Sequence, residues 1–127
     1  MEIVRLPDAE LYIMKIIWQQ GGDVTSHQIM EKLKGEKTWA LTTVLNFLIR
    51  LTNKGFVSVT KQGKQNIYTP QVAESDYAKL ESQSFLKRLH NNSFPSLVAC
   101  LYDGNAISQS DLAELQAFIN EKAGDGK

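Results

Sequence analysis

Apolar residues recur every three or four positions near the start of the chain, which predicts two helices. The first is expected over residues 8–20, and Gly21-Gly22 ends it. Its predicted apolar face is formed by Leu11, Met14, Ile17 and Trp18. The second is expected to begin at a capping box, Thr25-Ser26-His27-Gln28, and to end at Gly35. A short extended segment around Val24 separates the two helices.

A third helix is predicted over residues 41–53, and its two faces differ in chemistry. The apolar face is formed by Leu41, Val44, Leu48 and Leu51, with Phe47 at its edge. The opposite face carries Thr42, Thr43, Asn46, Arg50 and Asn53, with Ile49 at its border. This outer face contains no acid, whereas a solvated helix usually carries Glu and Lys. We expect the helix to pack through its apolar face and to present short polar side chains.

Alternating polar and apolar residues predict a β-hairpin directly after the third helix. One strand is expected over residues 56–60 and the other over residues 67–70, joined by a basic, glycine-containing turn at 61–65. Three helices followed by such a hairpin is the order of a winged helix-turn-helix. The expected fold class is therefore mainly α with a small β-hairpin wing.

The remaining segment predicts three more helices, over residues 74–90, from Ser93 and from Ser108, before a frayed tail at residues 123–127. Their apolar stripes include Phe85, Leu89, Leu97, Val98, Leu101, Leu112, Leu115, Phe118 and Ile119. Three short helices are too small to enclose a core of their own. We expect a second copy of the chain to cover them, the alternative being the N-terminal domain. This predicts a winged-helix DNA-binding domain at residues 1–71 and a helical dimerisation domain at 72–127.

The charges are unevenly distributed, although the chain has 14 Lys and Arg against 14 Asp and Glu. Residues 1–71 hold nine basic and six acidic residues, and residues 72–127 hold five and eight. No acid occurs between Glu36 and Glu74, and the cations of this interval are Lys37, Arg50, Lys54, Lys61 and Lys64. An acid-free stretch is typical of a surface that faces phosphates, because an acid there would repel them. The alternative is a chance cluster on a solvated face.

Composition excludes several other classes of protein. No apolar run reaches the roughly 18 residues of a membrane span, and no signal sequence is recognisable, so we expect a cytoplasmic protein. Cys100 is the single cysteine, and it is expected to lie in an apolar core. His27 and His90 have no partners at metal-ligand spacing, which predicts no metal and no cofactor. No grouping of nucleophile, base and acid suggests an enzyme.

Motifs along nearly the whole chain resemble the BlaI/MecI/CopY family of penicillinase-type repressors. The opening helix is similar from Leu6-Pro7-Asp8-Ala9-Glu10 to Trp18, and the third helix from Trp39 to Gly55. Gly63, Lys64 and Tyr68-Thr69-Pro70 resemble the family's wing. The resemblance implies a homodimer whose winged helices bind an inverted-repeat operator and repress transcription.

The resemblance also implies how repression ends. In the β-lactam branch, and so in antibiotic resistance, a membrane sensor pathway leads a protease to cleave the C-terminal domain. The family's scissile Asn-Phe pair corresponds here to Cys100-Leu101, which departs from the pattern. The copper branch needs a C-terminal cluster of cysteines, which a chain with one cysteine lacks.

In a helix-turn-helix the first half of the recognition helix meets base edges in the major groove. Thr42, Thr43 and Asn46 would lie there, and an Asn can pair with adenine through two hydrogen bonds. The alternative for Asn46 is a phosphate or water. Ile49 would either touch a thymine methyl or be a partly buried core residue, and we expect the second.

The cations have simpler predicted roles. Arg50 is expected to meet a phosphate, the alternative being an ion pair with Glu10. Lys61 and Lys64 are expected to meet the DNA backbone or the minor groove, the alternative being a solvated hairpin tip. Lys54 is included among the DNA-binding residues as a source of charge at the margin of the third helix. Trp39 is expected to pack at the start of the third helix. The rival function is a winged-helix module that binds another protein, without sequence-specific DNA binding.

Overall fold

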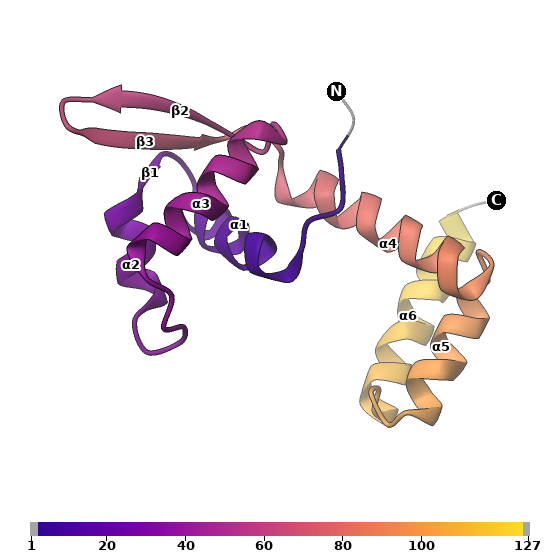
Figure 1. Ribbon diagram of the computed structural model, residues 1–127. Helices are drawn as coiled ribbons and strands as arrows, with labels where there is room; N and C mark the ends of the chain where they lie inside the picture. The colour runs from indigo at the N-terminus through magenta and orange to yellow at the C-terminus, as the bar shows by residue number, and fades with distance from the viewer. Residues whose placement is uncertain (1–2, 126–127) are drawn as a thin grey trace. The chain divides into compact units, whose positions relative to one another are not determined.

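Three helices and a small sheet are followed by three further helices in the computed structural model, which describes residues 3–125 (Figure 1). The first group comprises α1 (Asp8–Gln20), β1 (Val24–Thr25), α2 (Ser26–Leu33), α3 (Leu41–Asn53), β2 (Val57–Gln62) and β3 (Gln65–Pro70). The second comprises α4 (Glu74–His90), α5 (Phe94–Asp103) and α6 (Gln109–Asp125). Packing divides the chain into unit 1, residues 1–81, and unit 2, residues 82–127.

Local sequence signals set the ends of the helices in unit 1. Gly21 ends α1 in the left-handed conformation, with a φ of 77° that favours glycine. The predicted capping box of α2 is confirmed: the Gln28 amide donates to Thr25 Oγ1 over 3.1 Å, and the Thr25 amide donates to Gln28 Oε1 over 2.9 Å. The predicted bounds of α1 and α3 are confirmed as well.

The hairpin belongs to a three-stranded antiparallel sheet of order β1-β3-β2. The short extended segment at Val24 pairs with Tyr68 of β3, and Val59 of β2 pairs with the other side of Tyr68. The predicted turn over residues 61–65 was too long, because the ladder continues to the pair Gln62 and Gln65. Gly63 and Lys64 form the turn, and Gly63 supplies a φ of 64°. Figure 1 shows the hairpin projecting beyond the helices of unit 1.

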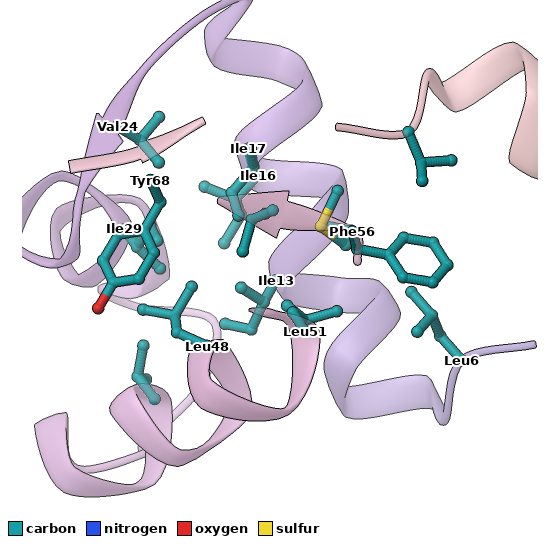
Figure 2. Close-up of a cluster of buried hydrophobic side chains, with 14 of the residues drawn as sticks. Leu6, Ile13, Ile16, Ile17, Val24, Ile29, Leu48, Leu51, Phe56 and Tyr68 are labelled. Carbon is teal, nitrogen blue, oxygen red and sulfur yellow. The ribbon is translucent and has the colours of Figure 1, made fainter. Parts of the chain in front are cut away.

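One apolar core joins the helices of unit 1 to its sheet (Figure 2). Its fully buried side chains are Ile13, Met14, Ile17, Val24, Ile29, Leu33, Val44, Leu48, Leu51 and Phe56. The predicted apolar face of α1 was partly wrong, because Leu11 and Trp18 are half-buried while Ile13 and Ile16 are buried. Leu41 was also misplaced: it is the first residue of α3, beyond the edge of the core, and is 47% exposed.

Two hydrogen bonds tie the start of α4 to the rest of unit 1. The Leu6 amide donates to Tyr77 Oη over 2.8 Å, and Trp18 Nε1 donates to the Val72 carbonyl over 2.8 Å. The Tyr77 ring packs edge-on against Phe56, with centroids 5.6 Å apart. Unit 1, as defined by packing, therefore includes the first part of α4, up to residue 81. The functional division between residues 71 and 72 stays a prediction.

Unit 2 is an array of helices with defined ends. Asn91 and Asn92 break the chain after α4 in the left-handed region, with φ values of 51° and 64°. Ser93 Oγ caps α5 by accepting from the Ser96 amide. Ser108 caps α6 reciprocally with Asp111. The tail predicted to fray from residue 123 is helical through Asp125, and residues 126–127 lie outside the described residues.

Replacing Tyr77 by Phe is expected to remove a component of the alkaline pH dependence of stability. Burial, followed by the hydrogen bond with Glu81, raises the pKa of Tyr77 from 10.0 to about 12. The unfolded chain releases this proton near pH 10, and the folded chain keeps it until about pH 12. The stabilisation linked to Tyr77 is thus complete below pH 10 and is lost as the pH rises to 12.

Urea unfolding across this pH range should show the free energy of unfolding falling more steeply for the wild type than for Tyr77→Phe. The variant also lacks the acceptor for the Leu6 amide, so it should start about 1 kcal/mol lower at neutral pH. Parallel pH profiles for the two proteins would contradict the prediction.

Candidate nucleic-acid interface

The outer face of α3 is exposed, as its periodicity requires. Val44, Leu48 and Leu51 are buried on the inner side and hold the helix against the core. Thr42, Asn46, Ile49, Arg50 and Asn53 are exposed on the outer side, and Thr43 is half-buried. The N-cap residue of α3 is Ala40, which has no side-chain oxygen. It therefore cannot accept a hydrogen bond from the N–H groups of the first helical turn. Neutral hydrogen-bonding groups and the positive end of a helix dipole therefore share one surface.

The charge on this surface is entirely positive. No acidic residue occurs in α3, β2 or β3, and the cations are Arg50 on the helix, Lys61 on β2 and Lys64 in the hairpin turn. Among the described residues, no salt bridge involves any of these three side chains. Their charges are thus available to an anion, with Arg50 in the last turn of α3 and both lysines on the hairpin.

Lys54 pairs with an acidic residue of α1, which the sequence did not predict. Its Nζ is 2.6 Å from Oε1 of Glu10, a residue that is only 2% exposed. The structure therefore does not support the alternative of an Arg50–Glu10 ion pair, because Lys54 pairs with Glu10 instead. The ion pair fastens the end of α3 to α1 and leaves less charge for a phosphate; contact between Lys54 and DNA stays a prediction.

Aromatic packing fixes the start of α3. The Trp39 ring meets Phe47 edge-on at 5.1 Å and Tyr12 of α1 at 5.7 Å, which confirms that Trp39 packs there. Lys37 Nζ lies 5.0 Å from the Tyr12 centroid and 5.4 Å from that of Trp39. Burial, and then Glu36, raises the pKa of the Tyr12 hydroxyl. The packing of Trp39 was predicted, but its contact with Tyr12 was not, because Tyr12 lies 27 residues earlier on α1 and no local pattern links the two.

Ile49 is the main correction on α3. It was expected to be partly buried, yet it is 57% exposed at the border of the outer face. It borders a hollow of about 140 Å³ between α3 and the sheet. The hollow is lined by Ile49, Thr52, Asn53, Val59, Asn66 and Tyr68.

The residues predicted for dimerisation form an open apolar surface on unit 2. Phe85, Leu89, Leu101, Phe118 and Ile119 are exposed, and Leu97, Val98, Leu112 and Leu115 are half-buried. Among the described residues of unit 2, no apolar side chain is buried. Helices α5 and α6 enclose two hollows, of about 470 and 420 Å³, lined almost wholly by apolar side chains such as Val98 and Leu115.

The segment that resembles a cleavage site is helical. Cys100 and Leu101 are both exposed on α5, so the expectation that Cys100 lies in a core was wrong. The Cys100 carbonyl accepts a hydrogen bond from the Gly104 amide over 3.1 Å. Because proteases act on flexible backbone, α5 would have to unwind locally before this bond could be cut.

Neither histidine belongs to a group of side chains, within the described residues, that could bind a metal ion. His27 is exposed, 3.9 Å from Glu31, and His90 is buried with its Nδ1 3.0 Å from Ser96 Oγ. Residues 3–125 contain no group of three or more His, Cys, Asp and Glu side chains that could hold a metal. In the same residues, no helix has both the length and the apolar character needed to cross a membrane.

Comparison with known proteins matches this arrangement to one family. The sequence profile of the penicillinase repressor family matches residues 6–121. The penicillinase repressor of Bacillus licheniformis is 32% identical over 120 residues, which cover 94% of this chain and 93% of that protein. The methicillin resistance regulatory protein MecI of Staphylococcus aureus (strain N315) is 30% identical over 117 residues, covering 92% and 94%.

Two solved structures share the fold. The DNA-binding domain of the repressor BlaI in solution matches with a TM-score of 0.53 and 36% identity, over 60% of this chain and 92% of that one. The monomeric form of Bacillus licheniformis BlaI, in complex with the blaP half-operator, matches with a TM-score of 0.51, 36% identity and the same coverage.

Replacing Lys54 by Met is expected to destabilise unit 1, because the nearly buried Glu10 carboxylate would lose its partner. Breaking a buried ion pair on one side costs about 3–5 kcal/mol, and the partial exposure of Lys54 places the expected loss at about 2–3 kcal/mol. Urea unfolding would measure it. The double variant Glu10→Leu with Lys54→Met should regain most of the loss, and Lys61→Met on the exposed hairpin should change little. Equal stability of Lys54→Met and the wild type would disprove the structural role.

Proposed function

The chain belongs to the penicillinase repressor family, and from that premise we propose that it is a transcriptional repressor, not an enzyme, that binds double-stranded DNA through α3 and the β2–β3 hairpin. The observation that carries the proposal is the acid-free surface of α3 and the hairpin, where exposed neutral side chains of the helix are accompanied by the cations Arg50, Lys61 and Lys64. A surface of this kind suits base edges in its middle and phosphates at its margins.

Helix α3 enters the major groove in this proposal, as the second helix of a helix-turn-helix does. Asn46 pairs with an adenine through its amide, and Thr42 and Thr43 contribute hydroxyls and methyls to neighbouring bases. All three lie in the first half of α3, and Asn46 and Thr42 are exposed. The burial of Val44 and Leu48 supports this orientation, because it fixes which side of the helix faces outward.

Arg50, Lys61 and Lys64 contact the DNA backbone in this proposal. Arg50 lies on the helix and the two lysines lie on the hairpin, so both elements contribute phosphate contacts. Lys54 is a weaker member of this set, since its ammonium group is held by Glu10. The backbone contacts give affinity and make it depend on salt, whereas the neutral residues of α3 give specificity.

Unit 2 joins two copies of the chain in this proposal. The open apolar surface of α4, α5 and α6, with Leu89 64% and Phe118 57% exposed, supports a partner that buries it. A second copy supplies a matching surface by two-fold symmetry, and two linked winged helices then recognise an inverted repeat. Linking the two heads raises the effective concentration of the second at the operator, so dimerisation supplies much of the affinity.

Loss of the dimer is the proposed route to derepression. The relatives include a penicillinase repressor and a methicillin resistance regulator, which supports a resistance gene as the regulated target. A protease of a sensor pathway would end repression by cutting α5, with the Cys100-Leu101 bond as the proposed position. The exposure of both residues supports access, and the helical backbone adds a local unfolding step.

Asn46→Ala is expected to weaken binding to a selected operator by about 1–3 kcal/mol and to change binding to random duplex DNA much less. The operator would be an inverted repeat selected from a random pool of duplexes by the wild-type chain. Lys64→Ala is the matched control: its losses on both DNAs should be similar, and its salt slope should be smaller by about one. Affinities would be measured at several salt concentrations.

Equal losses for Asn46→Ala on both DNAs would show that Asn46 does not recognise a base. A wild-type affinity that is independent of salt would favour the rival module that binds protein.

Ile119→Glu is expected to shift the chain from dimer to monomer and to lower operator affinity on the order of a hundredfold. The substitution places a charge on the exposed apolar face of α6, where burial in a dimer would require its costly desolvation. Ala117→Glu adds the same charge on the opposite side of α6 and should leave both properties unchanged. Sedimentation equilibrium and gel shifts would measure the two effects, and a dimeric Ile119→Glu protein would contradict this surface.

A further inference from the structure

Ile49 is an exposed apolar side chain at the border of the polar, acid-free face of α3. It lies one turn after Asn46 and one turn before Asn53, and Arg50 is its neighbour. More than half of its surface, 57%, is exposed, while Leu48 and Leu51 on either side are fully buried. The core of unit 1 therefore does not use this side chain.

A single exposed apolar residue is common on protein surfaces, so exposure alone assigns no role. The surroundings of Ile49 are more specific. Val59 of β2, 42% exposed, lies across the hollow of about 140 Å³ that Ile49 borders. Two apolar side chains from different elements thus border one hollow between the helix and the hairpin, and no acid occurs in either element.

The edges of the bases in the major groove offer one apolar group, the C5-methyl of thymine. A long side chain on a helix leans toward the helix N-terminus, which for Ile49 is toward Asn46. An adenine bound by Asn46 and a methyl group covered by Ile49 would then fall on adjacent base pairs. The hydrogen bonds of Asn46 require an adenine, whereas the apolar contact of Ile49 requires the methyl group of a thymine.

We infer that Ile49 is a specificity-determining residue that recognises a thymine methyl group next to the base contacted by Asn46. The inference rests on the DNA binding proposed above, with α3 in the major groove. It predicts that each half-site contains one thymine whose methyl group contributes to affinity through Ile49 alone.

The test begins with duplexes selected by the full-length wild-type chain from a random pool. Each thymine of the selected half-site is then replaced, one at a time, by deoxyuridine, which lacks only the methyl group. For the wild type, one position is expected to lose about fourfold in affinity, the equivalent of one methyl removed from contact. Other thymines that α3 does not touch should lose nothing.

Two variants assign that effect to Ile49. In Ile49→Ala, the deoxyuridine penalty at that position should disappear, because the contacting group is already gone; this is a double-mutant cycle between protein and base. Val59→Ala removes a comparably exposed apolar side chain on the other wall of the hollow, and it should keep the penalty. Both side chains are exposed, and thermal unfolding would check that both variants stay folded.

The outcomes separate this inference from the proposal on which it rests. A selected half-site with no methyl-dependent position, or with an equal penalty in the wild type and in Ile49→Ala, overturns the role of Ile49 and leaves DNA binding intact. A selection that enriches no sequence overturns both. Loss of the penalty in Val59→Ala but not in Ile49→Ala would assign the methyl contact to the hairpin instead.

Discussion

The packing of α3 against α1 determines what the rest of unit 1 can do. Val44, Leu48 and Leu51 are fully buried, and a helix has only one rotation about its axis that buries all three. Asn46, Ile49 and their neighbours face outward as a result. The aromatic cluster around Trp39 fixes one end of this contact, and the ion pair between Lys54 and Glu10 fixes the other. Side chains that must meet defined atoms need this rigidity.

Periodicity in the sequence was enough to predict α1, α3 and the hairpin, because local signals mark where these elements begin and end. It also separated the two faces of α3. It could not place the residues at the borders: Leu41 and Ile49 lie on the edge of the apolar arc, and only the neighbouring elements decide that both are exposed. Nor could it find the partner of Glu10, since Lys54 is 44 residues away and Arg50 was an equally reasonable candidate. Such pairings depend on tertiary distances that no local pattern contains.

Unit 2 illustrates the same limit at a larger scale. Its helices, caps and apolar stripes follow from the sequence, yet Cys100 proved exposed because the described residues of this unit enclose no apolar core. A stripe of apolar residues predicts that another surface buries it, but the stripe alone does not show which surface that is. Our proposal of a second copy rests on symmetry and on the need for two DNA-binding heads, which are arguments about function rather than about helix formation.

A net charge of zero gives the chain little general attraction for DNA, so affinity must come from the local field and from avidity. The cations are confined to the margins of α3 and to the hairpin, and the middle of the helix is neutral. Such a division lowers binding to random sequences, because a purely electrostatic surface would bind any duplex. Amide, hydroxyl and methyl groups discriminate between bases at a small cost in desolvation. In the proposed dimer each head alone binds weakly, so the apolar surface of unit 2 is as important to the proposed repression as the residues proposed to face the bases.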